Sequence, residues 1–275
     1  MSARRAFAAI AALPDEEIEI DRAALLIAAE EYPELELERY LGQLDRIATR
    51  VLDRLFPDAG PRETIARIND VLFQEDGFHG NVGEYYDPRN SYLNDVLDRR
   101  TGIPITLSTV YIEVARRIGF ALDGVGFPGH FLVQHSLGEE PLLIDPFAAG
   151  RILTPEDCQA RLDRTYGRRV KLEPDFLRAS SRRRILFRLL NNLKSIYVRR
   201  HDSRRALAAV ERMLLLIPDA HQELRDRGIL LSQTGRPMEA LAELARYRRL
   251  LPAAEDGERI DNLIERLRLH VSRLN

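Results

Sequence analysis

A histidine, an aspartate and two hydroxyl residues are the side chains of this sequence best placed for acyl-transfer chemistry. His130 opens an apolar run of strand length, and Asp145 ends the next such run. Upstream, the first turn of a helix expected over residues 106–118 carries Thr106 and Ser108. A nucleophile at a helix amino terminus, an imidazole base and a carboxylate that orients the imidazole form a nucleophile–base–orienter site. The spacing permits that geometry without proving it.

Each of these side chains also has a purely structural interpretation. His130 can be a buried histidine with satisfied ring nitrogens, and Asp145 before Pro146 can be a turn former or a structural partner of His130. The hydroxyls of Thr106 and Ser108 can bond to the backbone at the helix amino terminus. The sequence leaves catalytic and structural roles open.

The single cysteine, Cys158, comes after both strand residues, near the expected start of another helix. One cysteine excludes an intramolecular disulfide and a multi-cysteine zinc or iron–sulfur site. We expect Cys158 to be an inert, partly buried thiol. A metal site would need His79, His130 and His135 with Asp145, but residues five apart in a strand face opposite sides. We therefore expect no metal and no cofactor.

A polar and aromatic segment precedes the candidate site. As turn and capping residues these side chains need no further role. As a group they could also line a cleft that orients an extended peptide. The cleft hypothesis rests on Asn81, Tyr85, Tyr86 and Asn94.

The composition is that of a folded, water-soluble protein. The chain has 275 residues, of which 45% are hydrophobic and 31% charged, with a formal net charge of −2. That balance excludes disorder and a general nucleic-acid coat protein. Arg4-Arg5 before a short apolar run resembles a leader, but the run is soon followed by proline and acidic residues. We expect no leader, no membrane span and a cytoplasmic location.

The elements that would position the site are mostly helices. Residues 43–55 and 62–73 have helical periodicity, and short apolar runs at 124–127, 131–134 and 142–144 are separated by turn residues. A helix feeding a small antiparallel sheet is an α+β arrangement. The predicted fold is therefore α+β and predominantly helical.

The last third of the chain repeats with a period of 34 residues. Ala206-Leu207-Ala208 superposes on Ala240-Leu241-Ala242, and Pro218 superposes on Pro252. This period is that of a tetratricopeptide repeat, in which small residues lie where helices cross. Residues 256–274 have apolar residues at helical spacing and are expected to form a closing helix. We expect the repeats to bind a protein or peptide in a groove that includes Asn191, Tyr197 and Arg225.

An arginine-rich region links the two halves. Residues 161–212 contain sixteen Arg or Lys and five Asp or Glu, and the segment 178–188 holds the Arg182-Arg183-Arg184 cluster. Its partner could be an acidic protein, nucleic acid or the acidic amino-terminal helices of this chain. The simplest interpretation is a solvated helix face, since no aromatic motif for RNA stacking interleaves the charges. Nucleic acid is the least favoured partner.

Four motifs together resemble the SirB1-like family, which joins a transglutaminase-like domain to tetratricopeptide repeats. They are Arg-x-Gly-Ile-Pro-Ile-Thr-Leu-Ser from Arg100, Gly-x-Pro-Gly-His-Phe from Gly126, Asp-Pro-Phe from Asp145, and the repeats. The resemblance implies a papain-type cysteine, histidine and aspartate arrangement, with His130 and Asp145 as the last two. In this family the cysteine begins the helix that here ends at Gly119. Counting back from Gly119 places that position within Pro104–Thr106, where the chain has no cysteine.

The resemblance predicts two domains, a transglutaminase-like domain over residues 1–178 and helical repeats over 179–275. With the thiol missing, we expect a degenerate enzyme, or pseudoenzyme, that acts as a protein-interaction or regulatory module. The alternative is a hydrolase or acyl transferase that uses a hydroxyl or thiol with His130 and Asp145. The sequence leaves the catalytic status and the oligomeric state open.

Overall fold

The computed structural model describes residues 2–136 and 141–272, which form two compact units. They are Met1–Leu189 and Leu190–Asn275. The division falls inside helix α8 (Arg182–Arg199), whereas the sequence placed it between residues 178 and 179. Asp15 accepts the backbone N–H groups of Arg182 and Arg183, both at 2.9 Å, so the start of α8 is fixed to the first unit. A carboxylate at this position also complements the helix dipole.

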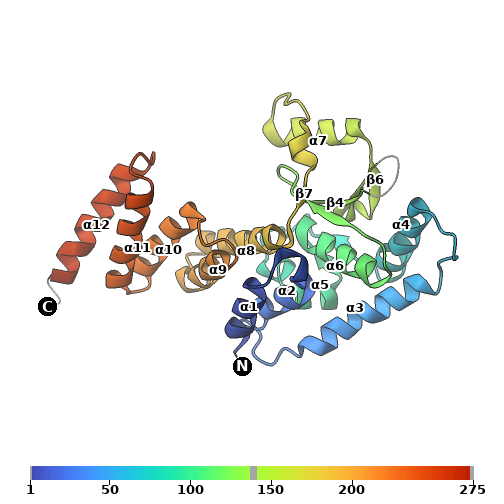
Figure 1. Cartoon of the computed structure of the whole chain (residues 1–275), viewed down its shortest axis with the longest axis horizontal. Helices are drawn as coiled ribbons and strands as arrows, with labels where there is room; N and C mark the ends of the chain where they lie inside the picture. Colours follow the sequence, from blue (N-terminus) through green and yellow to red (C-terminus); the bar gives the residue numbers. More distant parts are fainter. Residues whose placement is uncertain (1, 137–140, 273–275) are drawn as a thin grey trace. The chain divides into compact units, whose positions relative to one another are not determined.

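The first unit contains helices α1 to α7, the start of α8 and all the described strands (Figure 1). Its helices are α1 (Ala3–Ala11), α2 (Ile20–Ala28), α3 (Leu37–Leu52), α4 (Pro61–Asn69), α5 (Leu93–Arg99), α6 (Pro104–Arg117) and α7 (Pro155–Tyr166). Shorter helical turns are η1 (Asp15–Glu17), the π-helical η2 (Asp70–Glu75), η3 (Pro88–Asn90), η4 (Pro146–Ala148) and η5 (Pro174–Leu177). The helix predicted over residues 62–73 thus ends as an α-helix at Asn69, and the chain continues as the π-helical segment η2.

A five-stranded antiparallel sheet forms the centre of this unit. Its strand order is β6 (Arg151–Leu153), β5 (Leu142–Asp145), β4 (Leu132–His135), β3 (Asp123–Val125), β7 (Ala179–Ser180). Two further strands, β1 (His79–Gly80) and β2 (Thr101–Gly102), pair in parallel. The predicted small antiparallel sheet is confirmed, while β1, β2, β6 and β7 were not predicted from the sequence.

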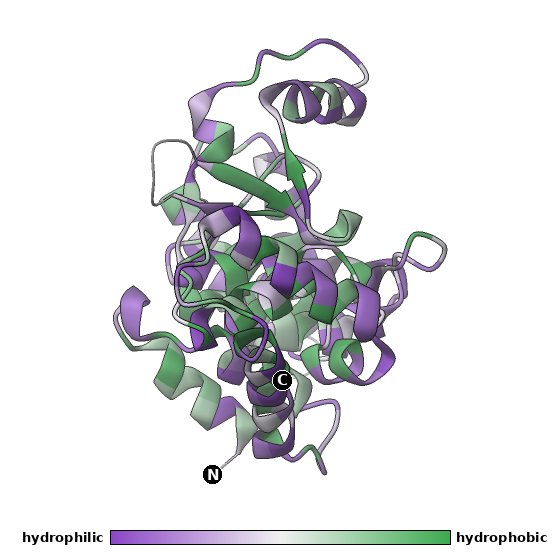
Figure 2. Ribbon diagram, turned by 90° about the vertical axis from the view of Figure 1, so that its right-hand side faces the viewer, coloured by the Kyte–Doolittle hydropathy of each residue, from purple (hydrophilic) through white to green (hydrophobic). Residues whose placement is uncertain are grey.

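Alternate residues of the strands face different helices. Val125 and Leu132 pack with Cys158 and Leu162 of α7. Helix α6 contacts β3 and β4, and α6 and α7 cover opposite faces of the sheet (Figure 1). The two middle strands, β4 and β5, each begin with hydrophobic residues, and hydrophobic ribbon is visible along the sheet (Figure 2).

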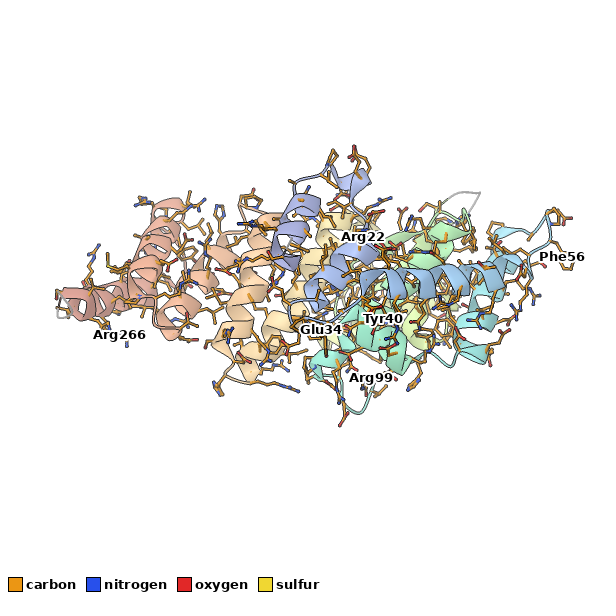
Figure 3. All side chains as sticks on the ribbon, turned by 90° about the horizontal axis from the view of Figure 1, so that it is seen from below. Arg22, Glu34, Tyr40, Phe56, Arg99 and Arg266 are labelled. Atoms are coloured by element: carbon orange, nitrogen blue, oxygen red, sulfur yellow. The ribbon has the colours of Figure 1, made fainter. Side chains whose placement is uncertain are left out.

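Side-chain bridges join the amino-terminal helices. Arg22, which lies at α2 beside α3, contacts Glu38 of α3 at 3.0 Å (Figure 3). The Tyr40 hydroxyl donates to Asp98 of α5 at 2.7 Å. These contacts fix α3 along the helices that support the candidate site.

The second unit is the helical repeat array predicted from the sequence. It contains the rest of α8, followed by α9 (Ser203–Leu216), α10 (His221–Gln233), α11 (Pro237–Leu250) and α12 (Gly257–Ser272). Ala206 and Ala240, which the 34-residue period aligns, are both fully buried. Within the described residues, the closing helix predicted over 256–274 is α12.

Close packing at Gly228 gives a first testable prediction. A Cβ atom there would lie 2.6 Å from Leu244, whereas one at Gly42 of α3 would meet only Arg46, at 3.5 Å. We expect Gly228→Ala to lower the free energy of unfolding by about 1–3 kcal/mol. Gly42→Ala should raise it by about 0.5–1 kcal/mol, because alanine costs less entropy in a helix. Urea denaturation measures both, and equal effects would contradict the packing of α10 against α11.

Candidate functional site

His130 and Asp145 meet inside the first unit. The Nε2 atom of His130 lies 2.9 Å from Oδ1 of Asp145, and the two side chains are 6% and 0% exposed. Asp145 ends β5, and His130 stands just before β4, its antiparallel neighbour. Because an ionised carboxylate only accepts, Nε2 carries the hydrogen of this bond. Nδ1 is then the basic nitrogen of the neutral ring, and no hydrogen bond to it occurs within the described residues.

Asp145 has two further donors, one of which is charged. The Phe147 N–H donates to Oδ1 at 3.1 Å, and Nη2 of Arg161 on α7 donates to Oδ2 at 2.5 Å. The carboxylate charge is therefore shared between His130 and a guanidinium.

Arg188 of α8 holds the backbone around His130. Its Nη2 donates to the carbonyl oxygens of His130 at 2.5 Å and Phe127 at 3.0 Å. Its guanidinium lies 5.4 Å from the centre of the Phe131 ring, and burial lowers the pKa of Arg188. Sequence analysis missed both Arg161 and Arg188, because nothing local separates them from the other arginines of the region.

Neither predicted hydroxyl is hydrogen-bonded to His130. Thr106 Oγ1 donates to the Asn90 carbonyl oxygen at 2.8 Å and accepts the Ile103 N–H at 3.0 Å, which caps α6. Ser108 Oγ is buried and has no hydrogen-bond partner among the described residues. A nucleophilic role for either hydroxyl stays a prediction.

Cys158 lies in an apolar cluster on α7. Its neighbours include Val125, Leu132 and Leu162, and it makes no hydrogen bond to His130 in the described part of the chain. Burial raises the pKa of the thiol, and the negative charge of Asp157 raises it further. Less of the thiol is then ionised at neutral pH, and the thiolate is the reactive form.

A second prediction concerns this thiol. In the native protein, Cys158 should react with Ellman's reagent at least about 100-fold more slowly than free cysteine, because it is both buried and protonated. In concentrated urea the rate should rise to that of an exposed thiol. Stopped-flow absorbance measures both rates, with Cys158→Ala as the blank, and rapid labelling of the native chain would contradict its burial.

The predicted cleft residues divide into buried and exposed groups. Asn81 Nδ2 donates to Asn90 Oδ1 at 3.1 Å, and its own Oδ1 accepts the Glu84 N–H at 2.9 Å, which organises the loop after β1. Asn94 on α5 is buried, and its Oδ1 has no hydrogen-bond partner among the described residues. Tyr85 and Tyr86 are 36% and 54% exposed, with ring centres 5.4 Å apart.

The loop that carries Tyr85 and Tyr86 is linked to His130 through neighbours that the two have in common. Tyr85 interacts electrostatically with Arg188, which bonds to the His130 carbonyl. The Phe147 ring stands edge-on to His130 at 5.8 Å, and it also fills the space that a side chain at Gly80 would need. The structure thus places the exposed tyrosines and the histidine on adjoining segments.

The three predicted groove residues differ in accessibility. Tyr197 is buried, with Arg205 over its ring at 5.8 Å, and Asn191 is half-buried. Arg225 forms ion pairs with Asp226 at 2.8 Å and with Asp256 at 3.0 Å. Their role in partner binding stays a prediction.

Part of the arginine cluster binds the amino-terminal segment of this chain. Arg182 donates to the carbonyl oxygens of Glu16 and Ile18, and Arg183 donates to that of Leu13. These two guanidinium groups therefore have intramolecular acceptors, which are main-chain carbonyl oxygens. A role for the cluster in binding another molecule stays a prediction.

The described residues hold no cluster of three or more histidine, cysteine or acidic side chains arranged to bind a metal ion. Across residues 2–136 and 141–272, no helix combines the length and the hydropathy needed to cross a membrane.

The fold and the site define a transglutaminase-like domain followed by tetratricopeptide repeats. Residues 38–191 match the family described as the transglutaminase-like superfamily, and residues 193–265 match the tetratricopeptide repeat family. No solved structure matches the chain significantly.

Two bacterial relatives align with this chain over most of their length, and a mouse protein aligns over a shorter segment. A UPF0162 protein of Xylella fastidiosa (strain 9a5c) is 38% identical over 273 residues, which is 95% of this chain and 96% of that protein. A UPF0162 protein of Vibrio cholerae is 31% identical over 217 residues, 78% of this chain and 80% of that one. F-box only protein 21 of Mus musculus is 40% identical over 105 residues, 35% of this chain and 17% of that protein. The chain belongs to the UPF0162, or SirB1-like, family, which confirms the assignment made from its motifs.

Proposed function

We propose that this protein is a protein-interaction module whose transglutaminase-like domain holds a peptide segment without reacting with it. One observation carries the proposal: His130 hydrogen-bonds through Nε2 to Asp145, while Thr106, Ser108 and Cys158 make no hydrogen bond to its ring in the described residues. A hydroxyl is a weak nucleophile unless a base accepts its proton. The residues therefore suit a positioning role better than turnover.

The charge around Asp145 supports the same conclusion. Arg161 also pairs with the carboxylate, so His130 shares its Asp145 partner with a guanidinium group. Arg188 and Phe147 N–H further fix the two segments that carry His130 and Asp145. The retained pair then serves as a scaffold for the neighbouring loop.

The loop after β1 supplies the surface for a peptide. Val82, Tyr85 and Tyr86 are the exposed large hydrophobic residues of this loop. Tyrosine combines apolar area with a hydroxyl that can bond to a peptide backbone, and it is enriched at protein interfaces. The tetratricopeptide repeats offer a second binding surface, since stacked helix pairs form extended surfaces for partners.

Activity assays test the non-catalytic part of the proposal. We expect amine incorporation into casein and hydrolysis of p-nitrophenyl acetate to be the same for the wild type and for His130→Ala. A saturable turnover that is lost in His130→Ala would overturn the proposal in favour of an acyl transferase or hydrolase. Thr106→Val, Ser108→Ala and Cys158→Ala would then identify the nucleophile.

Photo-crosslinking tests the binding part. A photoreactive phenylalanine analogue replaces Tyr86 in one variant and Phe56, an exposed residue beyond the end of α3, in a control (Figure 3). We expect irradiation in cells to yield a defined adduct at position 86 and none at position 56. Adducts of equal yield at both positions, or none at either, would contradict a peptide site at this loop.

A further inference from the structure

A hollow beside α3 has a different chemistry from that of the His130 region. Its volume is about 600 Å³, and no residue that lines it bonds to His130 or Asp145 in the described chain. Figure 3 views the molecule from the side on which α3 lies. The lining residues are Gln43, Arg46, Ile47, Thr49, Arg50, Asp76 and Arg100. We call this hollow the arginine pocket.

Positive charge exceeds negative charge in the arginine pocket. Three of the lining residues are arginines, and Asp76 is the single acid among them, which leaves an excess of two positive charges. Arg50 Nη2 lies 2.5 Å from Asp76 Oδ2, so this pair is nearly neutral. Outside the lining, Glu75 is shared between Arg50 at 3.6 Å and Arg54 at 2.9 Å, and the charges of Glu75 and Arg54 compensate each other.

The other two arginines carry unused donors. Nη1 of Arg100 is buried and makes no hydrogen bond among the described residues, although it forms an ion pair with Asp76 Oδ2 at 3.5 Å. Arg46 is exposed and has no hydrogen bond or ion pair within the described part of the chain. A buried guanidinium N–H without an acceptor is unfavourable, and a bound anion would satisfy it.

Arg100 lies at the C-terminal end of α5, and neighbouring residues hold its side chain in place. Arg100 follows α5 with φ +57°, in the left-handed region where glycine is the usual residue after a helix. Its guanidinium lies 4.9 Å from the centre of the Phe78 ring, which holds it toward the pocket residue Asp76. Gln43 is likewise fixed, because its Nε2 donates to the Leu97 carbonyl at 3.1 Å. Arg100 and Gln43 are thus held in place by contacts within the first unit.

We propose that the arginine pocket binds a phosphate group in its dianionic form. Guanidinium groups bind phosphate through paired N–H donors, and a dianion matches the excess of two positive charges. The volume exceeds that of the ion itself, so the phosphate can be free or part of a small phosphomonoester. This site is independent of the peptide site at Tyr86.

The structural alternative is that these arginines serve only to hold Asp76. That role accounts for the ion pair of Arg50 with Asp76 and for the ion pair of Arg100 with the same carboxylate. It does not account for Arg46, which faces the same hollow four residues before Arg50 and has no acid of its own in the described residues. Arg46 therefore separates the two explanations.

Calorimetric titration of the full chain in low-salt buffer tests the proposal. The probes are inorganic phosphate and O-phosphoserine, with serine and acetate as probes that lack phosphate. We expect saturable binding of both phosphate probes, weakened by added chloride because the contact is ionic. Tighter binding of phosphoserine would identify a phosphomonoester as the ligand, and tighter binding of phosphate the free ion.

Matched arginine variants localise the binding. Arg46→Gln should weaken phosphate binding by about tenfold, the usual effect of losing one charged hydrogen bond. Arg62→Gln, at an exposed arginine of α4 without a partner among the described residues, should leave it unchanged. Arg100→Gln should weaken it at least as much as Arg46→Gln, and Arg46→Gln remains decisive if Arg100→Gln does not fold. The proposal is overturned by the absence of saturable phosphate binding, by equal loss in Arg46→Gln and Arg62→Gln, or by acetate or serine binding as tightly as phosphoserine.

Discussion

Replacing Asp145 with asparagine is expected to lower the free energy of unfolding by about 3 kcal/mol, the usual cost of breaking a buried ion pair. The wild-type carboxylate accepts from His130 and Phe147 through Oδ1 and from Arg161 through Oδ2. An asparagine offers one oxygen and one NH₂ group. In either orientation of the amide, an N–H donor then faces a donor of the protein, and at least one partner loses its acceptor.

Two comparisons separate this effect from a general one. His130→Gln removes one hydrogen bond and no permanent charge, so we expect it to cost about 1 kcal/mol. Asp58→Asn changes an exposed aspartate in the loop after α3 and should leave the stability unchanged within about 0.5 kcal/mol. The order Asp145→Asn, His130→Gln, Asp58→Asn is therefore the expected order of destabilisation.

The measurement must report on the first unit, because a chain with two compact units need not unfold in one step. Urea denaturation followed by circular dichroism gives the overall change. Hydrogen exchange with mass spectrometry, read in β5 and α7, locates it. If Asp145→Asn is as stable as Asp58→Asn, the bonds of Asp145 do not hold the sheet to α7.

The meeting of His130 with Asp145 could be predicted, because it depends on neighbouring strands. Short apolar runs separated by turn residues predict antiparallel neighbours, and antiparallel pairing brings the start of β4 beside the end of β5. The 34-residue period likewise predicted the repeats, since small residues must recur where helices cross. These features rest on local patterns that a single sequence carries.

The partners of the pair could not be predicted in the same way. Arg161 and Arg188 reach the site from α7 and α8, across 16 and 58 residues of chain. They are two of many arginines in this region. Helical periodicity predicts which face of a helix is polar, but it does not identify the residue that a given arginine contacts. The division between the two units lies inside α8, where the helical pattern continues while the contacts change.

A second carboxylate, Asp21 of α2, should matter as much as Asp145, but in a pH-dependent way. Its Oδ2 lies 2.6 Å from Nη2 of Arg117 and 3.4 Å from Nη2 of Arg116, both at the end of α6. The side chains of Asp21 and Arg117 are 3% and 12% exposed. We expect Asp21→Asn to cost about 3 kcal/mol at neutral pH, because Arg117 then loses a buried counter-charge.

The pKa shifts of this cluster set the sign of the pH dependence. Burial by itself would raise the pKa of Asp21, but the hydrogen bond and charge of Arg117 outweigh it, and the pKa lies below its usual value. A lowered folded-state pKa stabilises the fold above the unfolded pKa, and this contribution is lost as the pH falls through the folded pKa. The stability difference between the wild type and Asp21→Asn should therefore be complete above about pH 5 and shrink below about pH 4.

Glu113 of α6 is the matched control, because it contacts the same two arginines. Burial raises the pKa of Glu113, and the charge of Asp21 raises it further. Because the folded state holds this proton more tightly than the unfolded state, ionisation of Glu113 lowers the free energy of unfolding as the pH rises past the unfolded pKa. Glu113→Gln should therefore lower the free energy of unfolding at neutral pH by less than Asp21→Asn does. The loss of stability of Glu113→Gln relative to the wild type should shrink as the pH rises from about 4 to 7. Urea midpoints measured between pH 3 and 8 test both variants. Parallel curves for the wild type and Asp21→Asn would mean that the Asp21 charge does not stabilise the contact between α2 and α6.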